Sequence, residues 1–124
     1  MTTQEINTPF ELFGYECGPG WLPLIQEAQS LIDKYNATVN DERGEVKFVQ
    51  VKEKWGELCL YLNFYPAELM DPIRELEEKS HHVCEHCGVS NADVKLQNTH
   101  GWYMTLCPDC REKELTRYNN MFKH

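Results

Sequence analysis

Two Cys-x-x-Cys pairs, Cys84–Cys87 and Cys107–Cys110, constrain the fold of this 124-residue chain more than any other sequence feature. The 19 residues between the pairs match the spacing of zinc sites that are built from two such pairs. Two sulfurs on one tight turn can occupy one side of a tetrahedron, and Gly88 permits the left-handed backbone that such a turn often needs. The pattern therefore predicts that one Zn²⁺ is bound by Cys84, Cys87, Cys107 and Cys110.

We expect the predicted ion to be structural. A site filled by four cysteines has no coordination position open to water or substrate, whereas a catalytic zinc keeps one. Zinc binding of this kind is worth on the order of 10 kcal/mol, which is comparable to the whole stability of a small domain. His86 lies inside the first pair and is the one realistic substitute ligand, while His81, His82 and His100 are expected to be exposed or to lie beside the ligands.

The segment around the pairs has the order of a treble-clef-like zinc module. Strand-like runs at 94–96 and 102–106 flank a turn at 98–101, so a short hairpin is expected between the pairs. A helix is predicted over 110–122, with an apolar stripe formed by Leu115, Tyr118 and Phe122. The second pair thus lies where a helix begins, and the helix dipole favours its thiolates.

The N-terminal part of the chain predicts a helix followed by a β-hairpin. Apolar residues recur at helical spacing from Trp21 to Tyr35, which predicts an amphipathic helix. The runs 45–54 and 57–65 flank Gly56, and the second run alternates between apolar and polar residues. The apolar face of this second strand is formed by Leu58, Leu60, Leu62 and Phe64.

A second helix is predicted after Pro66, with Asp71 as its N-cap and Pro72 as its first helical residue. Its apolar stripe consists of Leu69, Ile73, Leu76, Ser80 and Val83. The predicted fold class is therefore α+β. An antiparallel β-hairpin sheet is covered by two helices and is joined to the C-terminal four-cysteine zinc module.

The charge of the chain divides at residue 80. Residues 1–80 hold 7 Lys/Arg and 15 Asp/Glu, whereas residues 81–124 hold 5 of each together with all 5 histidines. The chain is therefore predicted to consist of an acidic α+β body (1–80) and a neutral zinc-binding module (81–124), packed as one structural unit. The net charge of −8 disfavours a general binder of nucleic acid phosphates, whose surface would be basic.

No catalytic signature is found in the sequence, and we expect that the protein is not an enzyme. The sequence contains no glycine-rich phosphate loop, nucleophile elbow, H-E-x-x-H motif or paired-carboxylate pattern. His-Asn-His nucleases also carry paired cysteines, but here His100 lacks the companion His and Asn at suitable spacing. The N-terminal residues resemble no export signal and no run approaches the ~18 apolar residues of a membrane span, so a cytoplasmic location is expected.

Three residues outside the pairs leave alternatives open. Cys59 is interpreted as packed on a strand and Cys17 as a free thiol, with a nucleophilic or redox role as the alternative. Trp55 lies with two lysines at the predicted hairpin tip. It is either an interaction point or part of a solvated turn with its ring folded back into the core.

Three stretches of the sequence contain, in order, a C-G-x-G-W opening, a K-E-K-aromatic-G-x-L hairpin and a C-terminal zinc-knuckle motif. They are E-C-G-P-G-W-L-P-L-I (16–25), Q-V-K-E-K-W-G-E-L-C-L-Y (50–61), and S-H-H-V-C-E-H-C-G with G-W-Y-M-T-L-C-P-D-C (80–88 and 101–110). This combination resembles a family of small phage- and prophage-encoded proteins, most of which have no assigned function. In its phage-like motifs, small size and acidity the chain also resembles anti-CRISPR inhibitors, including zinc-containing ones that act on type II RNA-guided nucleases.

These resemblances imply a non-enzymatic phage-type inhibitor that binds a host defence effector in the host cytoplasm, with a type II RNA-guided nuclease as the leading candidate. Such a nuclease holds its guide–target duplex in a basic channel, which attracts an acidic protein over a long range. The partner-binding surface is predicted to include Glu75, Glu77, Glu78, Asp41, Glu42 and Trp55. The alternative is a zinc-finger module in phage or host regulation that binds another protein, or binds nucleic acid through Lys95, Arg111, Lys113 and Arg117.

Overall fold

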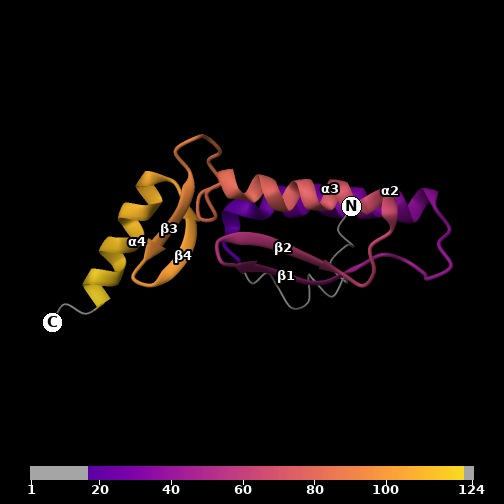
Figure 1. Ribbon diagram of the computed structural model, residues 1–124, viewed down its shortest axis with the longest axis horizontal. Coiled ribbons are helices and arrows are strands. Elements are labelled where there is room, and N and C mark those ends of the chain that lie inside the picture. Colours follow the sequence, from indigo (N-terminus) through magenta and orange to yellow (C-terminus); the bar gives the residue numbers. More distant parts are fainter. Residues whose placement is uncertain (1–16, 122–124) are drawn as a thin grey trace, which may run out of the picture.

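The computed structural model describes residues 17–121, and in the first part of this range two helices lie on one face of a β-hairpin (Figure 1). The elements of this part are η2 (Pro19–Trp21), α2 (Leu22–Thr38), β1 (Phe48–Lys54), β2 (Glu57–Leu62) and α3 (Ala67–Lys79). The two strands pair in antiparallel fashion. The predicted body, with a hairpin under two helices, is confirmed.

The second part of the chain adjoins one end of the body (Figure 1). Its elements are η3 (Ser80–His82), β3 (Lys95–Thr99), β4 (Trp102–Leu106) and α4 (Pro108–Met121). The two strands form a second antiparallel hairpin between the cysteine pairs, so the predicted order of turn, hairpin, turn and helix is confirmed. The helix begins two residues earlier than predicted because Pro108 suits the first helical position, and Phe122 lies outside the described residues.

The core of the body lies between the two helices and the inner face of the hairpin. Fully burying an aliphatic or aromatic side chain contributes about 1.5–3 kcal/mol, so this cluster dominates the stability of the body. It consists of Trp21, Leu24, Ile25, Ala28, Ile32, Tyr35, Val46, Phe48, Val51, Leu58, Leu60, Leu62, Leu69, Ile73 and Leu76. Each helix buries only one stripe, and within residues 17–121 no helix is long and apolar enough to cross a bilayer.

The start of α3 differs from the sequence prediction. The helix begins at Ala67 with Pro66 as its N-cap, so Pro72 lies inside it rather than at its first position. A proline there forfeits the hydrogen bond to the carbonyl four residues earlier and costs about 3 kcal/mol. The helix still starts early because this places Leu69 on the buried stripe, one turn before Ile73. Burial therefore outweighed the capping signal.

Both strands of the first hairpin are shorter than the predicted runs 45–54 and 57–65. The pairing shifts register next to Phe48, and beyond that point the Asn63 side chain supplements one remaining backbone bond, from the Asn63 N–H to the Lys47 C=O at 3.0 Å. The side-chain Oδ1 of Asn63 accepts the Lys47 N–H at 2.9 Å, and its Nδ2 donates to the Glu45 C=O at 3.0 Å. The open end of the hairpin is thus closed by Asn63.

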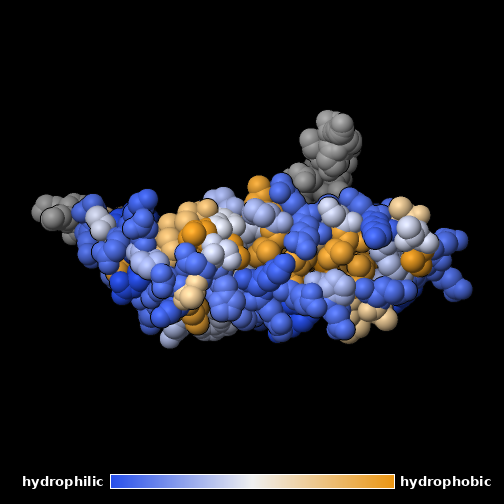
Figure 2. Space-filling view, turned by 90° about the horizontal axis from the view of Figure 1, so that it is seen from above, coloured by the Kyte–Doolittle hydropathy of each residue, from blue (hydrophilic) through white to orange (hydrophobic). Residues whose placement is uncertain are grey.

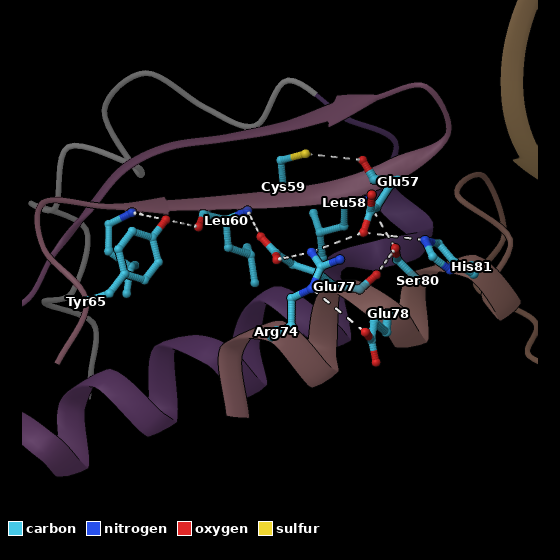
Figure 3. A network of polar contacts seen from close by, with 11 residues as sticks. Glu57, Leu58, Cys59, Leu60, Tyr65, Arg74, Glu77, Glu78, Ser80 and His81 are labelled. Atoms are coloured by element: carbon cyan, nitrogen blue, oxygen red, sulfur yellow. Dashed lines mark hydrogen bonds and ion pairs between the residues drawn. The ribbon is translucent and has the colours of Figure 1, made fainter. Parts of the chain in front are cut away.

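The outer edge of β2 is closed by side chains from the residues that follow it (Figure 3). The Leu58 N–H donates to Ser80 Oγ at 3.0 Å, and the Leu60 N–H donates to Glu77 Oε2 at 2.8 Å. The Tyr65 hydroxyl donates to the Leu60 C=O at 2.8 Å. An exposed strand edge is a template for pairing with another chain, and these contacts remove that template.

Candidate metal centre

The four cysteines of the two pairs converge on one point. Their Sγ atoms all lie within 4.8 Å of one another, and the Sγ atoms of Cys87 and Cys107 are 3.8 Å apart. A tetrahedral site with Zn–S bonds of about 2.3 Å has sulfur–sulfur edges of about 3.8 Å, so the cluster fits one such ion. The four can therefore bind one metal ion, and an all-sulfur donor set favours zinc. Within residues 17–121 no other group of metal-ligating side chains comes together in this way.

The backbone around each pair places the sulfurs. The Gly88 N–H donates to the Cys84 C=O at 2.9 Å, and the Cys84 N–H donates to the Val89 C=O at 2.9 Å. This turn holds Gly88 at φ 85°, the left-handed conformation that the sequence predicted. In the second pair the Cys110 N–H points to Cys107 Sγ, 3.4 Å away, in the first turn of α4. The first pair thus lies on a knuckle and the second at a helix N-terminus.

Burial and backbone hydrogen bonds act in opposite directions on the thiols of the cluster. Cys84, Cys107 and Cys110 are buried, and burial penalises a thiolate. At Cys84, hydrogen bonds from backbone N–H groups outweigh burial and lower the pKa of the thiol to about 7. At Cys110, burial and the adjacent thiols raise the pKa. When bound, the ion would supply the positive charge that holds all four groups as thiolates.

A glycine-rich segment of the body packs directly on the first knuckle. A Cβ atom at Gly20 would lie 2.1 Å from the carbonyl oxygen of Cys84, and one at Gly18 would lie 2.2 Å from that of Glu85. Only glycine fits at either position without moving backbone. Sequence analysis missed this role, because two glycines around a proline give no periodic signal and merely resemble a loop.

Side chains continue this contact between the body and the cluster. Trp21 is fully buried, and its Nε1 donates to the Val83 C=O at 2.8 Å, immediately before the first ligand. The buried Glu85 accepts the Thr105 N–H at 3.0 Å, and its own N–H donates to the Thr105 C=O at 2.9 Å. The Thr105 hydroxyl in turn donates to the Gly56 C=O at the tip of the first hairpin. The knuckle is therefore bonded to η2, to β4 and, through β4, to the first hairpin.

The histidines do not enter the cluster. The metal-ligating group consists of the four cysteines alone, so His86 does not replace one of them in this geometry. His81, His82 and His100 are exposed, as expected. The ring of His100 stacks on Tyr118 with centroids 3.5 Å apart, which anchors the turn of the second hairpin to α4.

The residues of the predicted acidic surface lie at two places on the body. The loop with Asp41 and Glu42 is at the end away from the cysteines, whereas Glu75, Glu77 and Glu78 are on the C-terminal half of α3, toward them (Figure 1). Asp41 is bonded to a neighbouring arginine and Glu77 to the edge of β2, so both carboxylates already have structural partners. The helix face is hydrophilic along its margins and has hydrophobic side chains along its middle (Figure 2). Glu42, Glu75 and Glu78 remain exposed.

Trp55 is not folded into the core. Its side chain is 70% exposed at the tip of the first hairpin, and its ring lies 5.9 Å from that of Tyr103 on β4, measured between centroids. The interpretation as a turn with a buried tryptophan is therefore wrong. The side chain stands at the surface, where a partner can reach it.

The basic residues of the alternative hypothesis are partly neutralised. They are Lys95 on β3 and Arg111, Lys113 and Arg117 on α4. Arg117 is paired with Glu114, and Arg111 lies 3.5 Å from a carboxylate oxygen of Glu112. Two of the four cations thus have carboxylate neighbours, which weakens this stripe as a phosphate-binding surface.

The two unpaired cysteines are not activated. Burial raises the pKa of Cys17 to about 11, and it also raises the pKa of Cys59 above its ordinary value. Both therefore remain neutral thiols near pH 7, and the thiolate is the nucleophilic form. Their environment gives no support to a nucleophilic role.

Comparison of the chain with protein-family models, with curated proteins and with solved structures finds no match. The resemblance to phage proteins and to anti-CRISPR inhibitors therefore stays a prediction. The residues themselves establish an α+β fold with a four-cysteine cluster that is bonded to both hairpins.

Proposed function

We propose that the four cysteines bind a structural zinc ion and that the protein acts through its surface, without catalysis. The carrying observation is the closed cluster of four sulfurs, because four protein ligands leave no coordination position for water or substrate. The contacts from Trp21, Gly20 and Glu85 support the same role, since they hold the body against the site rather than open a path to it.

The partner that charge favours is a protein with a basic surface. The chain carries a net charge of −8, and four thiolates with one Zn²⁺ add a further −2 when the site is filled, which gives about −10. Long-range attraction then speeds association with a basic partner. An inhibitor of a type II RNA-guided nuclease is the specific form that the sequence resemblance implies.

Direct binding to purified type II nucleases, with and without guide RNA, tests this function. We expect a complex whose association rate falls as salt is raised from low to moderate concentration, because the attraction is screened. Zinc content measured on the same sample should be one ion per chain. A zinc-loaded protein that binds none of the nucleases and leaves their cleavage unchanged would overturn the inhibitor proposal.

A charge-reversal pair tests which surface is used. Glu75→Lys combined with Glu78→Lys on α3 should slow association several-fold. The control variant, Glu27→Lys with Asp33→Lys, makes the same charge change on α2 and should slow association less. Glu77 is left unchanged because its carboxylate holds the edge of β2. Equal association rates for both variants would contradict the α3 surface.

A further inference from the structure

The tips of the two hairpins form an aromatic cleft of about 310 Å³. The turn of the first hairpin lies beside β4 (Figure 1), where the Thr105 hydroxyl donates to the Gly56 C=O. The lining residues of the cleft are Glu53, Lys54, Trp55, Gly101, Trp102 and Tyr103. The exposed fractions of Trp55 and Trp102 are 70% and 67%, so both indole rings remain accessible. The cleft is separate from the cysteine cluster, because none of its lining residues belongs to that cluster.

Trp55 occupies a backbone position that disfavours it. Lys54 pairs with Glu57, so Trp55 and Gly56 are the two central residues of the turn, with φ of 54° and 77°. Two-residue turns with both φ values positive favour Asn-Gly, Asp-Gly or Gly-Gly, and a bulky side chain there is strained. The ring recovers little of this cost by burial, because most of it is exposed. Folding alone therefore gives no reason for tryptophan at this position.

The second hairpin supplies an internal contrast. Its turn, His100-Gly101, also has positive φ values, 60° and 88°. There the strained side chain is used within the fold, because the His100 ring stacks on Tyr118 at 3.5 Å. The Trp55 ring lies beside Tyr103, with centroids 5.9 Å apart, but most of the Trp55 side chain is exposed to solvent. The difference points to a ligand for Trp55 outside the fold.

The chemistry of the cleft suits a cation. Aromatic faces attract an ammonium or guanidinium group within about 6 Å of a ring centroid. Glu53 adds a carboxylate, whose Oε2 also accepts the Gly56 N–H at 2.6 Å and so lies at the turn. The cleft contains a single cation, Lys54, and the net charge of −8 opposes a phosphate chain stacking on the same rings.

We propose that this cleft binds an arginine or lysine side chain of a basic partner protein by cation–π contact. The inference rests on the proposed function in so far as that function requires a basic partner, and it names the place where one of the partner's cations binds. Trp55 and Trp102 are the contact residues, and Glu53 supplies the opposing charge.

The three tryptophan indole N–H signals in a ¹H–¹⁵N spectrum give a direct test with a short arginine-rich peptide as the probe. We expect the signals of Trp55 and Trp102 to shift on titration, while the signal of the buried Trp21 stays in place as an internal control. The same peptide with citrulline in place of arginine keeps the shape but loses the charge, and should bind roughly tenfold more weakly. Equal binding of the two peptides, no shift, or tighter binding of an oligothymidylate would overturn the proposal.

Trp55→Asn separates binding from folding. Asparagine is favoured at this turn position, so the variant should fold with an unchanged or higher Tm and lose most of its affinity for the arginine peptide. Val49→Asn is the matched control, since it removes another exposed apolar side chain from the same hairpin, outside the cleft. Retained affinity in Trp55→Asn contradicts the proposal. Arginine binding without nuclease binding would refute only the proposed function, and the reverse result would refute only the cleft.

Discussion

The body and the C-terminal module of this molecule are stabilised by different interactions. Among the described residues, the core of the body contains 15 buried residues, most of them contributed by two helices and a hairpin. The C-terminal module has a cluster of only 5, and 3 of them are cysteines of the metal-binding group, with Val94 and Leu106 as the only aliphatic members among the described residues. A core of that size cannot offset the conformational entropy of some 40 residues. We therefore expect the module to depend on a metal ion bound by the four cysteines, whereas the body depends on apolar burial.

Loss of one ligand should have the largest effect on this contrast. Cys107→Ser is expected to abolish stoichiometric zinc binding and, with it, on the order of 10 kcal/mol that stabilises the module. The ¹H–¹⁵N spectrum should then lose the dispersed signals of residues 84–121, while the signals of residues in the core of the body persist. The matched change in the body, Leu58→Ala, should cost about 2–5 kcal/mol and leave zinc content at one per chain. A module that stays folded after chelation would refute the metal dependence.

The contact between the halves should be broken by the smallest possible side chain. Gly20→Ala places a Cβ atom 2.1 Å from the Cys84 carbonyl oxygen, and the atoms that it meets belong to the backbone, which cannot easily move away. We expect a loss of about 3 kcal/mol in the free energy of unfolding, measured by chemical denaturation, together with weaker zinc binding. Gly101→Ala is the control, because it meets nothing within 4 Å and costs only the strain of its positive φ. Equal losses for the two variants would show that the contact is unimportant.

The features that follow a local pattern were predicted from the sequence. The cysteine spacing identified all four residues of the cluster, and the alternation of the second strand identified Leu58, Leu60 and Leu62 as its buried face. Prediction failed where tertiary packing decides between local signals. Asp71-Pro72 is a good helix start in isolation, yet the burial of Leu69 extends α3 past it.

Contacts across long stretches of sequence carried no signal at all. Nothing local relates Gly20 to Cys84, or Trp55 to Tyr103, although both contacts define how the halves meet. The role of Glu77 was hidden for the same reason. On the sequence it belongs to an acidic run that is typical of a solvated helix face, but its carboxylate accepts the Leu60 N–H from the neighbouring strand.

That edge contact gives a prediction of intermediate size, confined to the body. Glu77→Ala leaves the Leu60 N–H without its acceptor and removes a partner of Arg74, which lies 3.2 Å from Glu77 Oε1. We expect a loss of about 1–2 kcal/mol in thermal or chemical unfolding, with zinc content unchanged. The exposed neighbour Glu75, changed to alanine, should stay within about 0.5 kcal/mol of the parent protein. Equal effects of the two changes would assign Glu77 to the surface rather than to the fold.

The smallest expected effect concerns Asp41, whose contribution to the stability of the body depends on pH. Hydrogen bonds from the Arg43 side chain and backbone, and then from the Tyr35 hydroxyl at 2.8 Å, hold the pKa of Asp41 well below its ordinary value. A carboxyl whose pKa is depressed by folding stabilises the protein above its unfolded pKa, and this contribution is lost as the pH falls through and below about 4. Asp41→Asn should therefore lower Tm at neutral pH. The difference in Tm between this variant and the parent protein should be smaller at pH 3. Scanning calorimetry between neutral pH and pH 3 measures this difference in Tm. Glu42→Gln, an exposed change in the same loop, should show a difference from the parent protein that does not vary with pH. A difference for Asp41→Asn that stays constant with pH would mean that the charge of Asp41 contributes nothing to the fold.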